Sequence, residues 1–168
     1  ELVLTTNGAR LATLAEPLAR AGLRGVNVSI DNDDRERFAT ITRGGDPGEV
    51  LAGIHAALDA GLEVKLNCVG LGGTNEDELG ALVDFAWRIG VTPRFIELMP
   101  LGEASKLPAS ALLPAAAIAS ALGERIDPRD WRGVDGRGPA RYARAADGSG
   151  RRVGFLTALS DEVCASGN

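Results

Sequence analysis

Two basic residues stand inside apolar stretches of the kind that form buried strands. Lys65 lies within residues 64–69, and Arg94 lies within residues 92–98. A cation inside a barrel needs an anion beside it, so two of them on neighbouring strands indicate an anion-binding floor. Two simpler interpretations stay open: Lys65 points outward between covering helices, or Glu97 neutralises one of the cations.

The surrounding pattern alternates between strands and helices. Helical spacing of apolar residues follows the first strand, and Pro17 inside it predicts a helix that begins near Ala15 or Glu16, with the proline in its first turn. The predicted strands cover residues 1–6, 25–30, 64–69 and 92–98, and two further helices cover residues 50–58 and 79–89. Such alternation with short loops predicts parallel strands joined by right-handed crossovers, in an open doubly wound sheet or in part of a barrel.

In either architecture the functional side chains are expected where the strands end. Four segments fall there: residues 5–8, 29–31, 70–75 and 97–102. No Gly-x-Gly-x-x-Gly pattern follows a strand, which disfavours a dinucleotide-binding fold.

After residue 102 the pattern changes. A short alanine-rich helix is predicted at residues 114–122 and irregular chain at residues 127–139. Residues 140–145 and 152–156 flank the sequence DGSG at 147–150, which predicts a β-hairpin. We therefore expect one unit at residues 1–102 and the start of a smaller α+β region at residues 103–168.

Composition excludes several functional classes. The net charge of −5 disfavours a nucleic-acid binder, and no apolar run is long enough to span a membrane. Two cysteines far apart in sequence disfavour a disulfide framework and favour a cytoplasmic location. The chain opens at Glu1 inside an apolar stretch, so we expect it to be an interior segment of a longer protein.

Taken together, a set of motifs resembles one family along the whole chain. They are LTTNG at residues 4–8, VNVSID at 26–31, ITR at 41–43, VKLN at 64–67, NEDE at 75–78, RFIELMPLG at 94–102, GPARY at 138–142 and VGFL at 153–156. In this order they resemble the radical S-adenosylmethionine (SAM) GTP 3′,8-cyclases of molybdenum cofactor biosynthesis. The resemblance implies a partial radical SAM (β/α) barrel with parallel strands.

The resemblance also implies a chemistry. In the family, a [4Fe–4S] cluster cleaves SAM to a radical that abstracts a ribose hydrogen from GTP, and the guanine ring is then attacked to give the cyclised pterin precursor. The protein positions and shields the reactants, because the cofactors supply the reactivity. The implied partners are GTP, the downstream cyclic pyranopterin monophosphate synthase and a second copy of the full-length chain in a homodimer.

Site roles are carried over motif by motif. Thr5, Lys65 and Arg94 are expected to bind GTP, the latter two through its phosphates, and Ser29 and Met99 are expected to bind SAM. Asn27 and Glu97 are expected to support them. Cys68 has no family role and is expected to be a buried strand residue.

Two departures from the family bear on function. The N-terminal Cys-x-x-x-Cys-x-x-Cys is absent from this chain, so we expect the chain alone not to cleave SAM. Cys164 matches the first ligand of the family's second cluster, but Gly167 stands where the next thiolate belongs. Two alternatives therefore stay open: a radical SAM enzyme with another substrate, or a non-catalytic nucleotide-binding module.

Overall fold

The structure is a computed structural model, and it describes residues 2–31, 36, 38, 45–127, 130 and 140–157. The chain divides into two compact units, residues 1–67 and residues 68–168, and each is described by itself below. The motif at 41–43, nearly all of the irregular stretch at 127–139, and both Cys164 and Gly167 lie outside the described residues.

Three parallel strands form the sheet of the first unit. They are β1 (Val3–Thr6), β2 (Gly25–Ser29) and β3 (Glu63–Gly70), in the order β1-β2-β3. The third strand continues beyond residue 67 into the second unit. The pairing is parallel throughout this unit, as the strand–helix alternation predicts.

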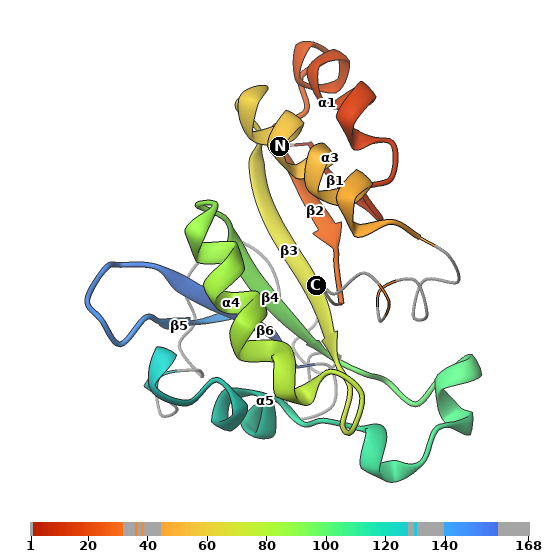
Figure 1. The fold of residues 1–168 in the computed structure, drawn as a ribbon, viewed down its shortest axis with the longest axis vertical. Helices are drawn as coiled ribbons and strands as arrows, with labels where there is room; N and C mark the ends of the chain where they lie inside the picture. The colour runs from red at the N-terminus through yellow and green to blue at the C-terminus, as the bar shows by residue number, and fades with distance from the viewer. Residues whose placement is uncertain are drawn as a thin grey trace. The chain divides into compact units, whose positions relative to one another are not determined.

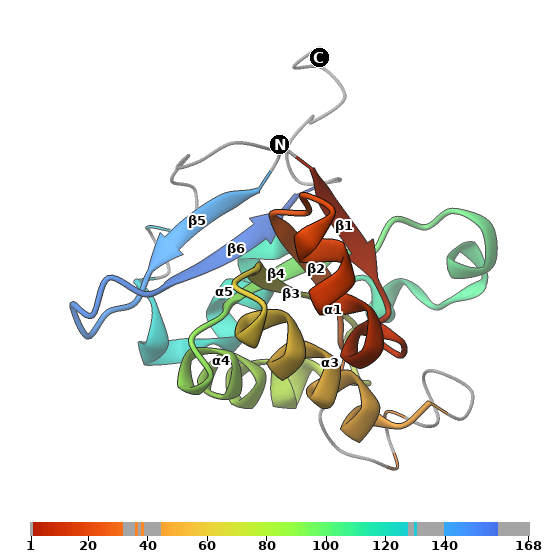
Figure 2. The same ribbon diagram turned by 90° about the horizontal axis from the view of Figure 1, so that it is seen from above.

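Two helices, α1 (Leu11–Arg20) and α3 (Pro47–Asp59), lie side by side next to this sheet (Figure 2). Beneath them, every second residue of β2 and β3 is apolar and buried, as with Val26, Val28 and Leu66 at 0% exposure. The close approach of the helices requires glycine at position 53, because a Cβ atom on Gly53 would lie only 2.8 Å from the Gly8 carbonyl oxygen. The predicted α/β architecture with parallel strands is thus confirmed.

The start of α1 differs from the sequence prediction. The helix begins at Leu11 rather than near Ala15, and Pro17 lies inside it. Proline cannot donate a hydrogen bond to the carbonyl four residues earlier, which here belongs to Thr13. Both Thr13 and Pro17 are exposed, so water can satisfy that carbonyl and the helix tolerates the proline.

The second unit contains a β-hairpin joined to another strand. The strands β5 (Arg141–Arg144) and β6 (Arg152–Leu156) pair antiparallel, and β6 pairs in parallel with β4 (Thr92–Glu97), giving the order β4-β6-β5 (Figure 1). The predicted hairpin around residues 147–150 is confirmed. The sequence pattern did not predict that β6 would pair with β4.

Helices α4 (Leu79–Arg88) and α5 (Ala115–Ala121) pack with β4 in this unit. Phe95 and Phe155 contribute adjacent rings to its core, with centroids 6.3 Å apart. Between β4 and α5 the chain forms short 3-10 turns at Gly102–Lys106 and Ala109–Ala111. Two more such turns are Glu76–Glu78 and Gly123–Arg125.

In the part of the chain that the structure describes, no helix combines the length and the apolar character needed to cross a membrane.

Candidate functional site

A row of three polar residues crosses the sheet of the first unit. Thr5 pairs in register with Asn27, and Asn27 pairs with Lys65. Register partners in a parallel sheet project from the same face, so these three residues, the polar row, share one face. The Asn27 side-chain amide donates a hydrogen bond to the Thr5 hydroxyl oxygen at 3.3 Å.

Strand alternation explains why this face is polar. The residues on either side of Asn27 and of Lys65 are apolar and buried, so the polar row falls on the opposite face of the sheet. The polar row is at least partly open: Thr5 is exposed, and Asn27 and Lys65 are intermediate. Lys65 therefore does not point outward between the covering helices, which removes one of the simpler interpretations of this lysine.

The Lys65 ammonium has a counter-ion on its own strand. Its Nζ lies 2.7 Å from Glu63 Oε1, and the two side chains are 26% and 60% exposed, respectively. The charge on Lys65 is thus balanced within the unit, as a cation on a partly buried sheet face requires.

Ser29 lies on the same face, two residues further toward the carboxyl end of β2. It pairs in register with Asn67 and is exposed, whereas Asn67 is only 9% exposed. Beyond it the chain leaves the strand, with the Ile30 amide donating to the Asn67 carbonyl at 2.9 Å. The Ser29 side chain is thus exposed at the end of the strand.

Arg94 and Met99 belong to the second unit. Arg94 pairs in register with Gly154 of β6, and a Cβ atom on this glycine would lie 2.7 Å from Arg94 Cγ. The stem of Arg94 therefore lies over the glycine, which fixes the path of the side chain. Met99 follows β4 and is 47% exposed. Thr5, Ser29 and Lys65 are thus brought together on one face, Arg94 and Met99 are placed in the other unit, and Cys164 lies outside the described residues.

Glu97, expected as a supporting residue, is almost fully buried at 2% exposure. Its Oε1 accepts a hydrogen bond from the Ala115 amide at 2.6 Å, where α5 begins. A carboxylate at a helix start satisfies an amide that has no partner within the helix. Glu97 therefore connects the end of β4 to α5.

Asn75 is a buried polar residue to which the sequence analysis assigned no role. At 0% exposure, its Oδ1 accepts from the Leu71 amide at 2.8 Å and its Nδ2 donates to the Val69 carbonyl at 2.9 Å. Nδ2 also lies 3.8 Å from the sulfur of Cys68, which is buried as predicted. Asn75 thereby closes the loop after β3, and the available sequence signal was an asparagine following several glycines.

The same loop packs against a distant segment. The Gly72 amide donates to the Ala111 carbonyl at 3.1 Å, and Leu71 forms an antiparallel bridge with Leu112. A Cβ atom on Gly72 would lie 2.1 Å from the Ser110 carbonyl oxygen, so only glycine fits there.

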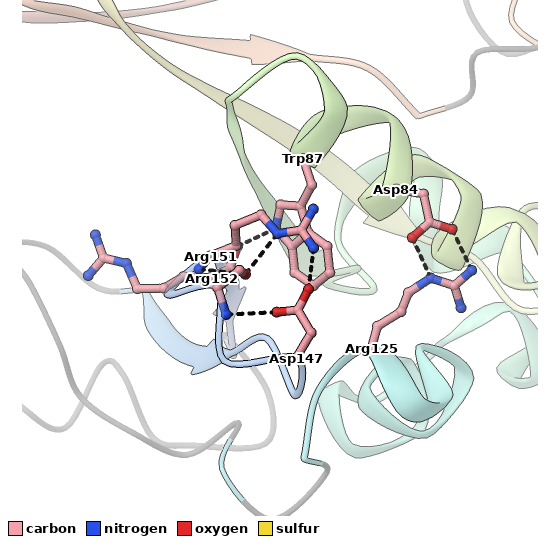
Figure 3. A network of polar contacts seen from close by, with 7 residues as sticks. Asp84, Trp87, Arg125, Asp147, Arg151 and Arg152 are labelled. Carbon is pink, nitrogen blue, oxygen red and sulfur yellow. Dashed lines mark hydrogen bonds and ion pairs between the residues drawn. The ribbon is translucent and has the colours of Figure 1, made fainter.

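A second polar cluster lies between α4 and the hairpin (Figure 3). Arg125 donates two hydrogen bonds to the Asp84 carboxylate, at 2.9 and 2.6 Å, and the hydrogen bond to Asp84 raises the pKa of Arg125 against the opposing effect of burial. The Arg151 guanidinium lies 4.4 Å from the Trp87 ring centroid, and the Trp87 indole donates to the Arg152 carbonyl at 3.1 Å. We call these residues, with Asp147, the hairpin cluster.

Asp147 completes the hairpin cluster. Hydrogen bonds from Ser149, and then from Arg151, lower the pKa of Asp147 to about 2. Two cavities of about 240 and 310 Å³ adjoin this cluster, and no predicted site residue lines either of them. The charges here are paired with one another, which is the arrangement of a structural cluster rather than of a binding site.

The residues of this chain do not fit an iron–sulfur cluster. Such clusters are held by several thiolates, and this chain has two cysteines, of which Cys68 is buried in β3 against Asn75. Among the described residues there is no group of three or more His, Cys, Asp or Glu side chains suited to a metal ion.

Comparison with known proteins identifies relatives along the whole chain. GTP 3′,8-cyclase from Rhodopseudomonas palustris (strain TIE-1) is 45% identical over 168 residues, covering 100% of this chain and 48% of the relative. GTP 3′,8-cyclase from Pelotomaculum thermopropionicum is 43% identical over 166 residues, covering 98% of this chain and 51% of the relative. GTP 3′,8-cyclase from Paracoccus denitrificans is 46% identical over 169 residues, covering 100% and 48%.

The chain spans about half the length of the curated relatives it matches. These similarities confirm the resemblance found in the sequence. The family model described as the radical SAM superfamily matches residues 1–86, a stretch that includes the polar row and Ser29. The chain therefore belongs to the radical SAM superfamily.

Proposed function

We propose that the protein containing this chain is a GTP 3′,8-cyclase, which converts GTP to the cyclised precursor of molybdenum cofactor biosynthesis. The observation that carries the proposal is the polar row, a partly open set of substrate-type side chains on one face of a parallel sheet. It lies in a chain that is similar over its whole length to proteins named GTP 3′,8-cyclase.

Lys65 and Arg94 would hold the phosphates of GTP. An ammonium acts as a compact charge with three donors, and a guanidinium adds a planar pair of donors, so both suit phosphate oxygens. The placement of Lys65 within the polar row supports this role for the first unit. The stem of Arg94, held over Gly154, supports a defined position for the second cation.

Thr5 would contact GTP from the same row, through a hydroxyl that already accepts a hydrogen bond from Asn27. Ser29 and Met99 would contact SAM. Both side chains are exposed: Ser29 is the last residue of β2, and Met99 follows the end of β4. The radical SAM family uses SAM and a [4Fe–4S] cluster, and these supply the hydrogen abstraction. The residues of this chain bind and orient the reactants and exclude water.

The remaining expectations belong to this proposal. The protein would act in the cytoplasm as a homodimer and would pass its product to the cyclic pyranopterin monophosphate synthase. Residues 1–102 would belong to the barrel, and residues 103–168 would begin a smaller C-terminal region. The glycine at position 167 supplies no ligand for a second cluster. The alternative function is therefore that of a radical SAM enzyme that acts on a substrate other than GTP.

The test uses the complete protein, reconstituted anaerobically with iron and sulfide, reduced with dithionite as the source of the electron that SAM cleavage consumes, and incubated with GTP and SAM. We expect the 3′,8-cyclised nucleotide to form, and we expect Lys65→Met to weaken GTP binding by about 10- to 100-fold, as for loss of a hydrogen bond between charged groups. Isothermal titration calorimetry measures the affinity.

Lys106→Met is the matched control. Lys106 pairs with Glu103 at 2.8 Å on an exposed turn, so its loss removes the same charge without touching the polar row. We expect GTP affinity to stay unchanged in this variant. Absence of the cyclised product from a protein with a reconstituted cluster, or equal effects of the two lysine variants, would contradict the proposal.

A further inference from the structure

Glu63 pairs with a proposed phosphate ligand, Lys65, and belongs to none of the motifs from which the site roles were assigned. Its carboxylate lies 2.7 Å from Lys65 Nζ. The two residues are two positions apart on β3, so their side chains leave the same face of the sheet. The proposed phosphate ligand is therefore held by an internal anion in the described structure.

The position of Glu63 along the strand matters. Glu63 is the first residue of β3, so it lies at the amino end of the strand. Ligands of parallel α/β sheets and barrels bind at the carboxyl ends of the strands. Seen from Lys65, that end of β3 lies in the opposite direction from Glu63. A phosphate bound at that end would therefore draw the Lys65 ammonium away from Glu63.

The Glu63 carboxylate lies largely in the open in the part of the chain that the structure describes. Its side chain is 60% exposed, and its register partner on β2 is Gly25, which presents no side chain. The carboxylate can move into solvent when Lys65 finds another partner.

The balance of charges favours that exchange. An ion pair this exposed changes an equilibrium by about fivefold at most. A triphosphate offers several charged oxygens, and charge-assisted hydrogen bonds to them are stronger than a screened surface pair. A ligand without phosphate offers Lys65 nothing in exchange for Glu63.

We propose that Glu63 is a displaceable counter-ion that holds Lys65 until a polyphosphate ligand replaces it. Glu63 thereby acts as a positioning residue that holds Lys65 in the unliganded protein, and its displacement lowers the affinity for polyphosphate ligands while leaving that for uncharged analogues unchanged. This inference rests on the proposed function, because it takes Lys65 as a phosphate ligand.

The test measures the affinity of the complete protein for GTP and for guanosine by isothermal titration calorimetry. Glu63→Gln keeps the size of the side chain and removes the competing charge. We expect this variant to bind GTP about two- to fivefold more tightly, with no change for guanosine. We expect the gain to vanish in the Lys65→Met background, because the competition acts through Lys65.

Glu16→Gln is the matched control within the same unit. Glu16 pairs with Arg20 on the exposed surface of α1, at 3.2 Å, so the substitution makes the same change in net charge. We expect no change in GTP affinity. An equal gain in the Glu16 and Glu63 variants would indicate a general charge effect and would overturn the inference.

The outcomes separate this inference from the proposed function. If Lys65→Met leaves GTP affinity unchanged, the role of Lys65 in the proposed function fails, and the inference fails with it. If Lys65→Met weakens GTP binding but Glu63→Gln does not strengthen it, only the inference fails. A gain from Glu63→Gln that persists without Lys65 would show direct repulsion of the ligand and would also overturn the inference.

Discussion

Two asparagines in the chain differ in burial and in hydrogen bonding, and the comparison shows how a structural polar residue differs from a polar residue on an open sheet face. Asn75, in the second unit, is fully buried and its amide is occupied by backbone groups of one loop. Asn27, in the first unit, lies on a partly open sheet face, with a single 3.3 Å hydrogen bond to Thr5. Both belong to motifs that resemble the same family, so burial and hydrogen-bond satisfaction, rather than motif membership, distinguish their roles.

The largest effect on stability is expected at the buried asparagine. Asn75→Ala leaves the Leu71 amide and the Val69 carbonyl without their partner in a site closed to water. We expect the free energy of unfolding to fall by about 2–3 kcal/mol, measured by urea denaturation of the complete protein. Asn75→Asp should also destabilise the protein at neutral pH, because an ionised carboxylate at this buried position would face the Val69 carbonyl oxygen.

A smaller effect is expected from the same change in the polar row. Asn27→Ala removes one long hydrogen bond at a partly open position, so we expect a loss of less than about 1 kcal/mol in the same denaturation experiment. Its GTP affinity should fall, because Thr5 loses the amide that orients its hydroxyl. If Asn27→Ala destabilised the protein as much as Asn75→Ala, the contrast between the two regions would be wrong.

The smallest effect on stability is expected at Asp147, an exposed member of the hairpin cluster. Asp147 resembles the polar row in its exposure, and it resembles the Asn75 loop because its hydrogen bonds are made within one turn. The folded-state pKa of Asp147 is lowered from 3.8 to about 2, so its stabilising contacts are present above pH 3.8 and are lost as the pH falls through about 2. The Ser149 amide donates to Asp147 Oδ1 at 2.9 Å and should report the change.

Nuclear magnetic resonance of the Ser149 amide between pH 5 and about 1.5 provides the measurement, with the pH limits chosen to bracket the usual range of carboxyl pKa values. We expect a midpoint near the lowered value and no such transition in Asp147→Asn. A midpoint at the ordinary pKa of an aspartate would mean that the turn does not hold its carboxylate in solution.

Local patterns predicted the elements well, because strands and helices place apolar residues at characteristic spacings. The buried alternation around Lys65 sufficed to predict β3 and to mark the lysine as unusual. The motif resemblance then identified Thr5, Ser29 and Lys65 as neighbours in function, and the structure brings these three onto one face. The position of Pro17 was misjudged because the cost of an interior proline depends on the exposure of Thr13, which the pattern does not reveal.

Non-local partners account for what the sequence could not predict. The pairing of β6 with β4 joins segments that are separated in the sequence by α5. Asn75 obtains its role from backbone groups whose directions are set by the fold. Glu63 precedes the predicted strand at 64–69 and was assigned no role, and its contact with Lys65 follows from the side-chain geometry on one face.

The contact between Gly72 and Ser110 also has a consequence for the order of events during protein synthesis. In the loop after β3, the Gly72 amide donates to the Ala111 carbonyl and Leu71 forms its β-bridge with Leu112. The ribosome adds both of these partners well after the loop itself. Until those residues leave the exit tunnel, the loop lacks these two contacts, even if the strand that precedes it has already folded. A translational pause placed before codon 110 would prolong this open interval, whereas a pause placed after residues 110–112 have emerged would not.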